Sequence, residues 1–279
     1  MHKWLWILTL FIGGVLWSQE MVCTPEDRNA FSAKIEEIKD LPSQTSGSLL
    51  VSVGETFLGT PYVSGTLEVG ELEKLVINLR GLDCTTFVES VLAFSILIRE
   101  KDTSFDNYLA TLQKIRYRNG KLSGYASRLH YFSEWIRDNE RKGLVKDISA
   151  SLGGIPAEKA RDFMTSHRDL YPRLSDLNAY QELLAVEKQL EKQPYFYVPG
   201  SVLSERLNEL QHGDIIALAT NINGLDVTHT GIIYKNKDGV LHLMHASSKG
   251  RVEISEKPLL KYLAGIKSNT GILVARPVF

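Results

Sequence analysis

The sequence has little cysteine, no excess of positive charge and no hydrophobic run of about 20 residues. Two cysteines among 279 residues, Cys23 and Cys84, exclude a disulfide framework and a cysteine-rich zinc finger. A formal net charge of −1 gives no global positive field, so neither nucleic acid nor an anionic membrane surface is expected as a partner. With 43% hydrophobic and 23% charged residues, the composition is typical of a folded globular protein. The length fits one elaborated domain or two modest ones.

An apolar run from Trp4 to Trp17 has 14 residues, too few for a membrane span of about 20. Lys3 precedes it and a polar break follows at 18–20, which predicts a signal peptide over 1–19. A lipoprotein anchor at Cys23 is disfavoured because Val22, rather than a small residue, stands before it. An uncleaved N-terminal anchor is the other alternative, and each alternative takes the protein out of the cytosol.

Helical patterns dominate the first hundred residues. Thr24, followed by a proline and acidic residues, predicts a helix N-cap, and a second helix is expected over 49–58 before a short strand over 75–79. The segment 84–98 is apolar on nearly every side, which predicts a buried central helix with Asp83 as its N-cap.

The remaining sequence changes from helical to strand-like patterns. Residues 101–200 carry amphipathic helix patterns and predict a helical insert. Short β-rich runs separated by turn signals follow Pro199, over 214–219, 227–234, 240–246, 252–255 and 271–276. Helices followed by strands predict an α+β fold with a small antiparallel sheet.

Cys84 begins the predicted central helix. The unpaired N–H groups and the dipole at a helix N-terminus favour an anion, so the thiol pKa is expected to be lowered toward a reactive thiolate. The backbone N–H of Cys84 could also stabilise an oxyanion. The alternative is an unreactive buried cysteine, and a nearby base would decide between the two.

His229 and His245 flank a predicted hairpin whose turn length decides their geometry. A two-residue turn at 238–239 would put them on opposite faces of the hairpin. A three-residue turn with a left-handed glycine would put them on one face, with Gly231 leaving room between them. His242 lies on the other face in either register and is expected to be an ordinary strand histidine.

Cys84 with two histidines suggests nucleophilic catalysis. His229 would be general base and acid, and His245 would orient its ring. The same three side chains could instead hold a hydrolytic zinc ion, but no HExxH helix accompanies them. The helix N-terminus favours a free thiolate over a zinc-bound one, so no metal and no cofactor are expected.

Five segments stand in one specific order: LGTPY (58–62), LDCTTFVE (82–89), HGD (212–214), THTGI (228–232) and MHAS (244–247). This order resembles the NlpC-type branch of the papain-like cysteine hydrolases. The resemblance implies a papain-like fold, in which the cysteine begins a helix packed on a small antiparallel sheet or barrel. It places Cys84, His229 and His245 at the nucleophile, base and third-residue positions, and Tyr62 at a tyrosine that lines the cysteine site.

Two further segments, YASRLHYFSEWI (125–136) and FMTSH (163–167), look like a narrower family. They are similar to the N-acetylmuramoyl-L-alanine amidase-like family of secreted Gram-negative proteins. The predicted insert at 101–200 accounts for the separation of 145 positions from Cys84 to His229, which is more than compact NlpC-type members need. The resemblance implies one periplasmic amidase domain over 20–279 that cleaves between the lactyl group of muramic acid and L-alanine in soluble muropeptides, in cell-wall turnover or recycling.

A muropeptide carries several carboxylates, and Arg128 could bind one of them bidentately. The alternatives are a surface ion pair for Arg128 and structural roles for the insert histidines. Trp135 and Phe132 are expected in the core of the insert. The expected substrate-binding residues are Tyr62, Asp83, Ser127, Arg128, His130, Ser166, His167 and Ser247.

Two other functions fit the same residues. One is an endopeptidase of the same fold that cuts the bond between D-glutamate and the diamino acid. The other is a muropeptide-binding module without catalysis. The residues alone do not separate the two amide bonds.

Overall fold

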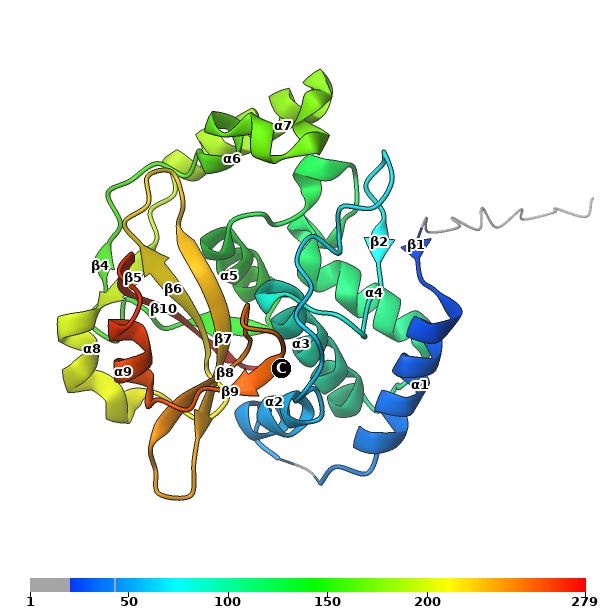
Figure 1. Cartoon of the computed structure of the whole chain (residues 1–279), viewed down its shortest axis with the longest axis vertical. Helices are drawn as coiled ribbons and strands as arrows, with labels where there is room; N and C mark the ends of the chain where they lie inside the picture. Colours follow the sequence, from blue (N-terminus) through cyan, green and yellow to red (C-terminus); the bar gives the residue numbers. More distant parts are fainter. Residues whose placement is uncertain (1–20, 43) are drawn as a thin grey trace, which may run out of the picture.

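The computed structural model describes residues 21–42 and 44–279, so the predicted signal peptide at 1–19 lies outside the described residues. The chain forms a mixed α+β structure, with one large antiparallel sheet and helices on both of its faces (Figure 1). None of the helices within the described residues is long and apolar enough to cross a membrane.

The large sheet has the strand order β4-β5-β10-β6-β7-β8-β9, and β3 also pairs with β10. A separate parallel pair joins β1 (Met21–Val22) to β2 (Leu75–Val76). The strands of the large sheet are β3 (Val145–Asp147), β4 (Ile155–Pro156), β5 (Phe196–Pro199), β6 (Ile215–Thr220), β7 (Val227–Lys235), β8 (Leu241–Ala246), β9 (Val252–Ile254) and β10 (Asn269–Pro277).

The α-helices are α1 (Pro25–Ile38), α2 (Ser46–Glu55), α3 (Cys84–Glu100), α4 (Phe105–Arg116), α5 (Phe132–Arg141), α6 (Phe163–Ser166), α7 (Leu177–Glu191), α8 (Gly200–Arg206) and α9 (Leu259–Ala264). Short 3₁₀ helices are η1 (Arg118–Gly120), η2 (Tyr125–Ser127), η3 (Arg168–Leu170), η4 (Pro172–Ser175) and η5 (Leu207–Glu209).

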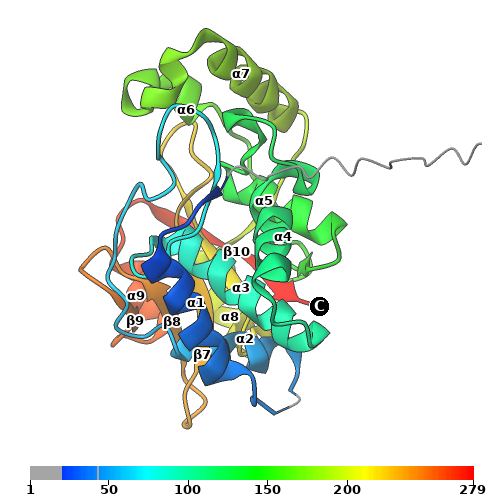
Figure 2. The same ribbon diagram turned by 90° about the vertical axis from the view of Figure 1, so that its right-hand side faces the viewer.

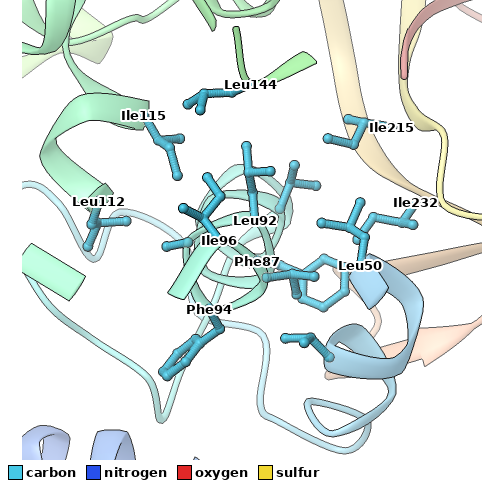
Figure 3. Packing of buried hydrophobic residues seen from close by; sticks show 14 of the residues in the cluster. Leu50, Phe87, Leu92, Phe94, Ile96, Leu112, Ile115, Leu144, Ile215 and Ile232 are labelled. Atoms are coloured by element: carbon cyan, nitrogen blue, oxygen red, sulfur yellow. The ribbon is translucent and has the colours of Figure 1, made fainter. Parts of the chain in front are cut away.

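Helix α3 is the central helix that the sequence predicts. The Asp83 side chain accepts a hydrogen bond from the Thr86 N–H at 2.8 Å, and Thr86 Oγ1 accepts from the Asp83 N–H at 2.9 Å. This reciprocal capping box fixes the residue at which the helix begins. Apolar side chains surround α3, including Leu92 and Ile96 of the helix and Ile232 of β7 (Figure 3). Cys84 is thereby held at one end of a rigid, buried element.

The sheet buries both of its faces. In β6, Ile215 and Ala217 belong to the core around α3, while Ile216 and Leu218 belong to a second core beneath α8 and α9. Figure 1 shows α8 and α9 on the side of the sheet away from α3. The strand-like patterns after Pro199 did not predict these two helices, because six or seven residues are too few to show helical periodicity.

Residues 101–200 form helices as expected, but they also contribute strands to the sheet. β3 and β5 both pair with β10, so this region is not purely helical. Its outer part, η2 together with α6 to α7, has a small core of its own that includes Met164, Leu174 and Leu183. We call residues 163–191 the helical lobe; it stands above α5 in Figure 2. Trp135 and Phe132 lie in the main core beside α3, rather than in a separate core of the insert.

Candidate active site

Helix α3 packs against β7, which brings Cys84 to the strand that carries His229. The main-chain N–H groups of Thr230 and Thr85, and the Thr85 hydroxyl, act to lower the pKa of the Cys84 thiol, although burial outweighs them. Cys84, His229 and Thr230 line one small cavity of about 120 Å³. Cys84 and the candidate base His229 therefore line the same small cavity.

The hairpin register puts the two histidines on one face. Ile232 pairs with Met244, and Gly239 adopts a left-handed φ of 80° in a three-residue turn, which confirms the second of the two predicted registers. A Cβ atom on Gly231 would lie 3.0 Å from Cβ of His245, closer than ordinary packing allows. The missing side chain of Gly231 leaves the space in which the two imidazole rings meet.

His229 Nε2 lies 2.7 Å from His245 Nδ1, with the rings nearly perpendicular. This hydrogen bond occupies Nε2 of His229 and leaves its Nδ1 available to a partner in the Cys84 cavity. A metal ion shared by the two histidines would have to separate the nitrogens that face each other here. Among residues 21–42 and 44–279, no group of three or more His, Cys, Asp or Glu side chains is arranged to hold a metal ion.

Tyr262 of α9 completes the surroundings of His245. The two rings lie 5.3 Å apart between centroids in an edge-to-face arrangement, and His245 Nε2 is buried without a hydrogen-bond partner. Burial, with the charges of Glu253 and Cys84, raises the pKa of Tyr262 to about 12, so its hydroxyl stays protonated near the thiol. The sequence did not indicate Tyr262, because the six residues of α9 are too few to show a helical pattern.

Burial controls the protonation states at this site. Burial, together with the charge of Asp83, raises the pKa of the Cys84 thiol to about 11. Burial also lowers the pKa of His229 to about 3, with a further contribution from His245, and lowers that of His245 to about 4. The expected lowering of the thiol pKa was therefore wrong, because desolvation of the charged form outweighs the helix N-terminus. At neutral pH the pair is a thiol and a neutral imidazole.

A second cavity of about 200 Å³ adjoins the first and shares Thr85, Leu129, His130 and Leu225 with it. Its other walls come from four regions. These are the loop before β2 (Gly65, Leu67, Glu68), the start of α3 (Asp83, Glu89), the segment from η2 to α5 (Tyr125, Arg128, Tyr131) and the helical lobe (Met164, Tyr171). The predicted residues Asp83, Arg128 and His130 thus lie along one continuous cleft with Cys84.

Tyr62 also lies near the nucleophile. Its N–H donates to the Gly250 carbonyl at 2.8 Å, and burial followed by the charges of Cys84 and Asp83 raises its pKa. His130 lies inside the cleft, where Nε2 bonds the Tyr125 carbonyl at 2.8 Å. Burial followed by the Arg128 charge lowers the pKa of His130 well below its ordinary value, so its ring is neutral.

Tyr62 and four other predicted contact residues lie outside the walls of these two cavities. The Ser127 hydroxyl donates to the Gly124 carbonyl at 2.6 Å, beneath η2. Ser166 and His167 are exposed at the end of α6, where His167 stacks on Phe163. Ser247 is buried in the turn after β8, where its hydroxyl accepts from the Lys249 N–H at 3.3 Å.

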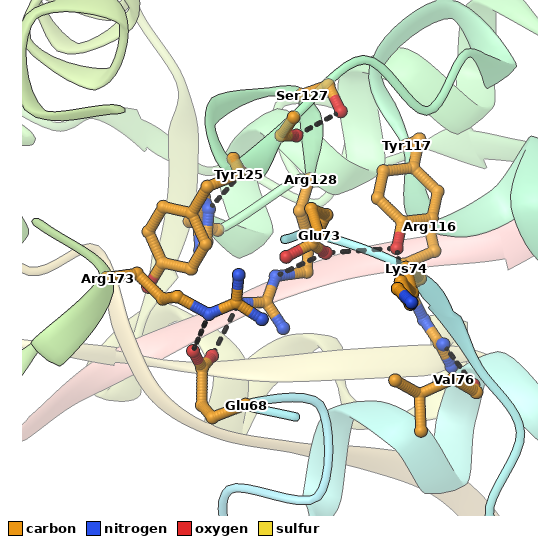
Figure 4. A network of polar contacts seen from close by, with 12 residues as sticks. Glu68, Glu73, Lys74, Val76, Arg116, Tyr117, Tyr125, Ser127, Arg128 and Arg173 are labelled. Atoms are coloured by element: carbon orange, nitrogen blue, oxygen red, sulfur yellow. Dashed lines mark hydrogen bonds and ion pairs between the residues drawn. The ribbon is translucent and has the colours of Figure 1, made fainter. Parts of the chain in front are cut away.

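Arg128 is only 7% exposed and belongs to a cluster of charges that the sequence did not reveal (Figure 4). It bonds Glu68 through Nη2, and its Nε lies 3.4 Å from Glu73. Arg173 of η4 contacts Glu68 from the other side at 3.9 Å. Glu68 and Glu73 stand about 60 residues before Arg128 in an irregular segment, so no local pattern could have linked them to it.

A family model described as N-acetylmuramoyl-L-alanine amidase-like matches residues 52–272, which include the Cys84 helix and the histidine hairpin. The chain belongs to this family. An N-acetylmuramoyl-L-alanine amidase from Bacteroides uniformis is 38% identical with a TM-score of 0.78, and the match covers 83% of this chain and 98% of that one. A search of curated proteins found no match.

Two other solved structures resemble this amidase-like chain. A Bacteroides fragilis protein with a provisional xylanase assignment is 42% identical with a TM-score of 0.75, over 80% of this chain and 98% of that one. A Legionella pneumophila protein is 22% identical with a TM-score of 0.70, over 91% and 96% of the two chains. At that identity the second likeness supports the fold alone.

Proposed function

We propose that this amidase-like protein is a cysteine amidase of papain-like, NlpC type. It hydrolyses the bond between N-acetylmuramic acid and L-alanine in soluble muropeptides, in cell-wall turnover or recycling. The observation that supports this most is the shared cavity of Cys84 and His229, with His229 hydrogen-bonded to His245. The family match supports the class of substrate. The apolar segment at 4–17 is the basis for proposing export to the periplasm.

The reaction starts from the neutral thiol and the neutral imidazole. As the Cys84 sulfur attacks the lactyl carbonyl carbon, its proton moves to Nδ1 of His229. His229 then gives that proton to the leaving amine of L-alanine, and the C–N bond breaks to leave a thioester on Cys84. Water, deprotonated by His229, attacks the thioester and releases the lactyl carboxylic acid and the free thiol.

His245 is the positioning residue in this scheme. When its Nδ1 accepts the hydrogen from Nε2 of His229, the proton-free nitrogen of His229 is Nδ1. In that tautomer, the 2.7 Å contact holds the His229 ring while Nδ1 is free to take the proton of the Cys84 thiol. No charged carboxylate takes part, which agrees with the lowered pKa values of both rings.

Three donors are available to the oxyanion. The backbone N–H of Cys84 lies at the N-terminus of α3, where helix N–H groups lack partners. The hydroxyls of Tyr62 and Tyr262 lie near the thiol and remain protonated because burial raises both pKa values. A hydrogen-bond donor to developing negative charge typically contributes on the order of 10²-fold or more to the rate.

The carboxylates at the cleft do not favour glycoside hydrolysis. Such a reaction needs an acid and a base on two available carboxyl groups. Here Asp83 caps α3, Glu89 pairs with Arg116 at 2.7 Å, and Glu68 pairs with Arg128. The provisional xylanase assignment of the Bacteroides fragilis protein therefore has no support in this site.

The test is mass spectrometry of defined muropeptides incubated with the protein, with Cys84→Ala and Cys23→Ala as matched variants. We expect free stem peptide and intact sugar from the parent and from Cys23→Ala, and no cleavage by Cys84→Ala. If the sugar keeps L-alanine and D-glutamate, the protein is instead an endopeptidase. No cleavage by any form would make it a binding module.

A further inference from the structure

We propose that the Glu68 side chain occupies a binding site for a substrate carboxylate, and that a free carboxylate of the stem peptide displaces it from Arg128 and Arg173. This inference rests on the proposed function for the identity of the ligand. Figure 4 shows Glu68 below the two guanidinium groups, on a segment of chain separate from both. The ion pairs to Glu68 define the site and its present occupant.

The two arginines are held in place without help from Glu68. The guanidinium groups of Arg128 and Arg173 lie 5.0 Å and 6.0 Å, respectively, from the centroid of the Tyr125 ring. Arg173 also donates to the carbonyls of Glu71, Val69 and Leu72. The site would therefore keep its shape when the Glu68 side chain leaves.

Glu68 is the exchangeable member of the cluster. Its side chain is 39% exposed, whereas Glu73 is 1% exposed and accepts a hydrogen bond from Tyr117. Because Arg173 binds the loop through main-chain carbonyls, the Glu68 side chain can rotate into solvent while the loop stays in place.

The charge balance of the cluster requires an exchange rather than an addition. Two arginines face two carboxylates, Glu68 and Glu73, in a largely buried setting. A substrate carboxylate added to this set would leave one negative charge uncompensated, which is costly away from water. When the substrate carboxylate replaces Glu68, the charges remain balanced. The planar guanidinium of Arg128 can then donate two hydrogen bonds to that carboxylate.

The cluster also has unused hydrogen-bonding capacity. The Nε atom of Arg128 is buried without a hydrogen-bond partner, although Glu73 lies near it. Arg128 lines the same cavity as Thr85 and His130, which the Cys84 cavity shares. A ligand carboxylate here would fix the stem peptide relative to the nucleophile.

The experiment measures binding by calorimetry in the Cys84→Ala background, where substrate persists. The probes are a tripeptide muropeptide with a free D-glutamate α-carboxylate and the same molecule with that group as a carboxamide. Glu68→Gln should bind the free acid about two- to fivefold more tightly and bind the carboxamide as the parent does, since a partly exposed ion pair no longer competes. Glu71→Gln is the matched control, because only its main chain contacts Arg173.

Arg128→Lys keeps the charge and should abolish the preference for the free acid, with thermal unfolding measured to verify folding. Equal effects of Glu68→Gln on both probes, weaker binding of the acid, or no binding of either would overturn the carboxylate site. A carboxylate preference without cleavage by the Cys84 enzyme would sink only the proposed function. Cleavage without that preference would sink only the site.

Discussion

At the residue scale, the site is defined by three side chains whose charges are suppressed by burial. Cys84 keeps its proton because burial disfavours the thiolate, and the rings of His229 and His245 stay neutral for the same reason. A preformed thiolate–imidazolium pair is therefore not the resting state. Proton transfer accompanies the attack, and the active form needs only neutral His229.

This state predicts activity that persists in acid. Since the pKa of His229 is lowered to about 3, the base stays neutral and kcat/KM should be constant from pH 7 to about 5. It should fall only as the pH approaches about 4, where His245 also gains its proton. A pH profile of muropeptide cleavage measures this directly. An acid limb centred near 6.5, the ordinary histidine value, would contradict it.

At the scale of elements, α3 and the β7–β8 hairpin position the chemistry. The capping box of Asp83 and Thr86 fixes the start of α3, and the turn with Gly239 fixes the histidine face. Asp83 has a second effect, because its negative charge helps to raise the thiol pKa of Cys84. Substitution by asparagine separates the capping effect of Asp83 from the effect of its charge, since asparagine is as good an N-cap as aspartate.

Asp83→Ala should lower the free energy of unfolding by about 1 kcal/mol, whereas Asp83→Asn should change it by a few tenths at most. Both variants remove the charge, so both should lower the thiol pKa and speed alkylation of Cys84 between pH 8 and 10. Urea unfolding and iodoacetamide alkylation rates measure the two effects, with Cys84→Ala correcting for Cys23. An unchanged alkylation profile in Asp83→Asn would show that the charge does not reach the thiol.

At the scale of the whole molecule, acid should weaken the fold through its buried histidines. His245 is 2% exposed, and its pKa falls from 6.5 to about 4 on folding. Above pH 6.5 the His245 ring is neutral in both the folded and the unfolded state, so its titration does not reduce the free energy of unfolding. Below 6.5 the unfolded chain binds more protons, so stability is lost as the pH falls toward 4.

His245→Gln should therefore flatten the dependence of unfolding free energy on pH between 6 and 4.5. The expected difference from the parent is at most about 1.4 kcal/mol per pH unit. The variant is compared with the parent because other groups also change the slope of unfolding free energy against pH. Carboxylates with raised pKa values, such as Glu73 and Asp226, change it in the opposite direction. Equal slopes in the two proteins, measured by urea unfolding, would show that protonation of His245 does not weaken the fold in acid.

Local patterns determined much of the fold. Thr24 and Asp83 were predicted as N-caps, and both cap helices because side-chain oxygen reaches the free N–H groups of the first turn. The β-rich runs between turn signals predicted strands at β6 and β7, and the hairpin sequence limited the histidine geometry to two registers. The segments at 125–136 and 163–167, together with the one around Cys84, indicated the amidase-like family that the family model then matched.

Only the tertiary structure decided what depends on contacts between distant residues. It chose the register, joined β3 and β5 to the sheet, placed Tyr262 beside His245 and paired Arg128 with Glu68. It also reversed the expected direction of the Cys84 pKa. Periodicity and capping act over one or two turns of chain, whereas burial and charge pairing depend on the packing of segments far apart in the sequence.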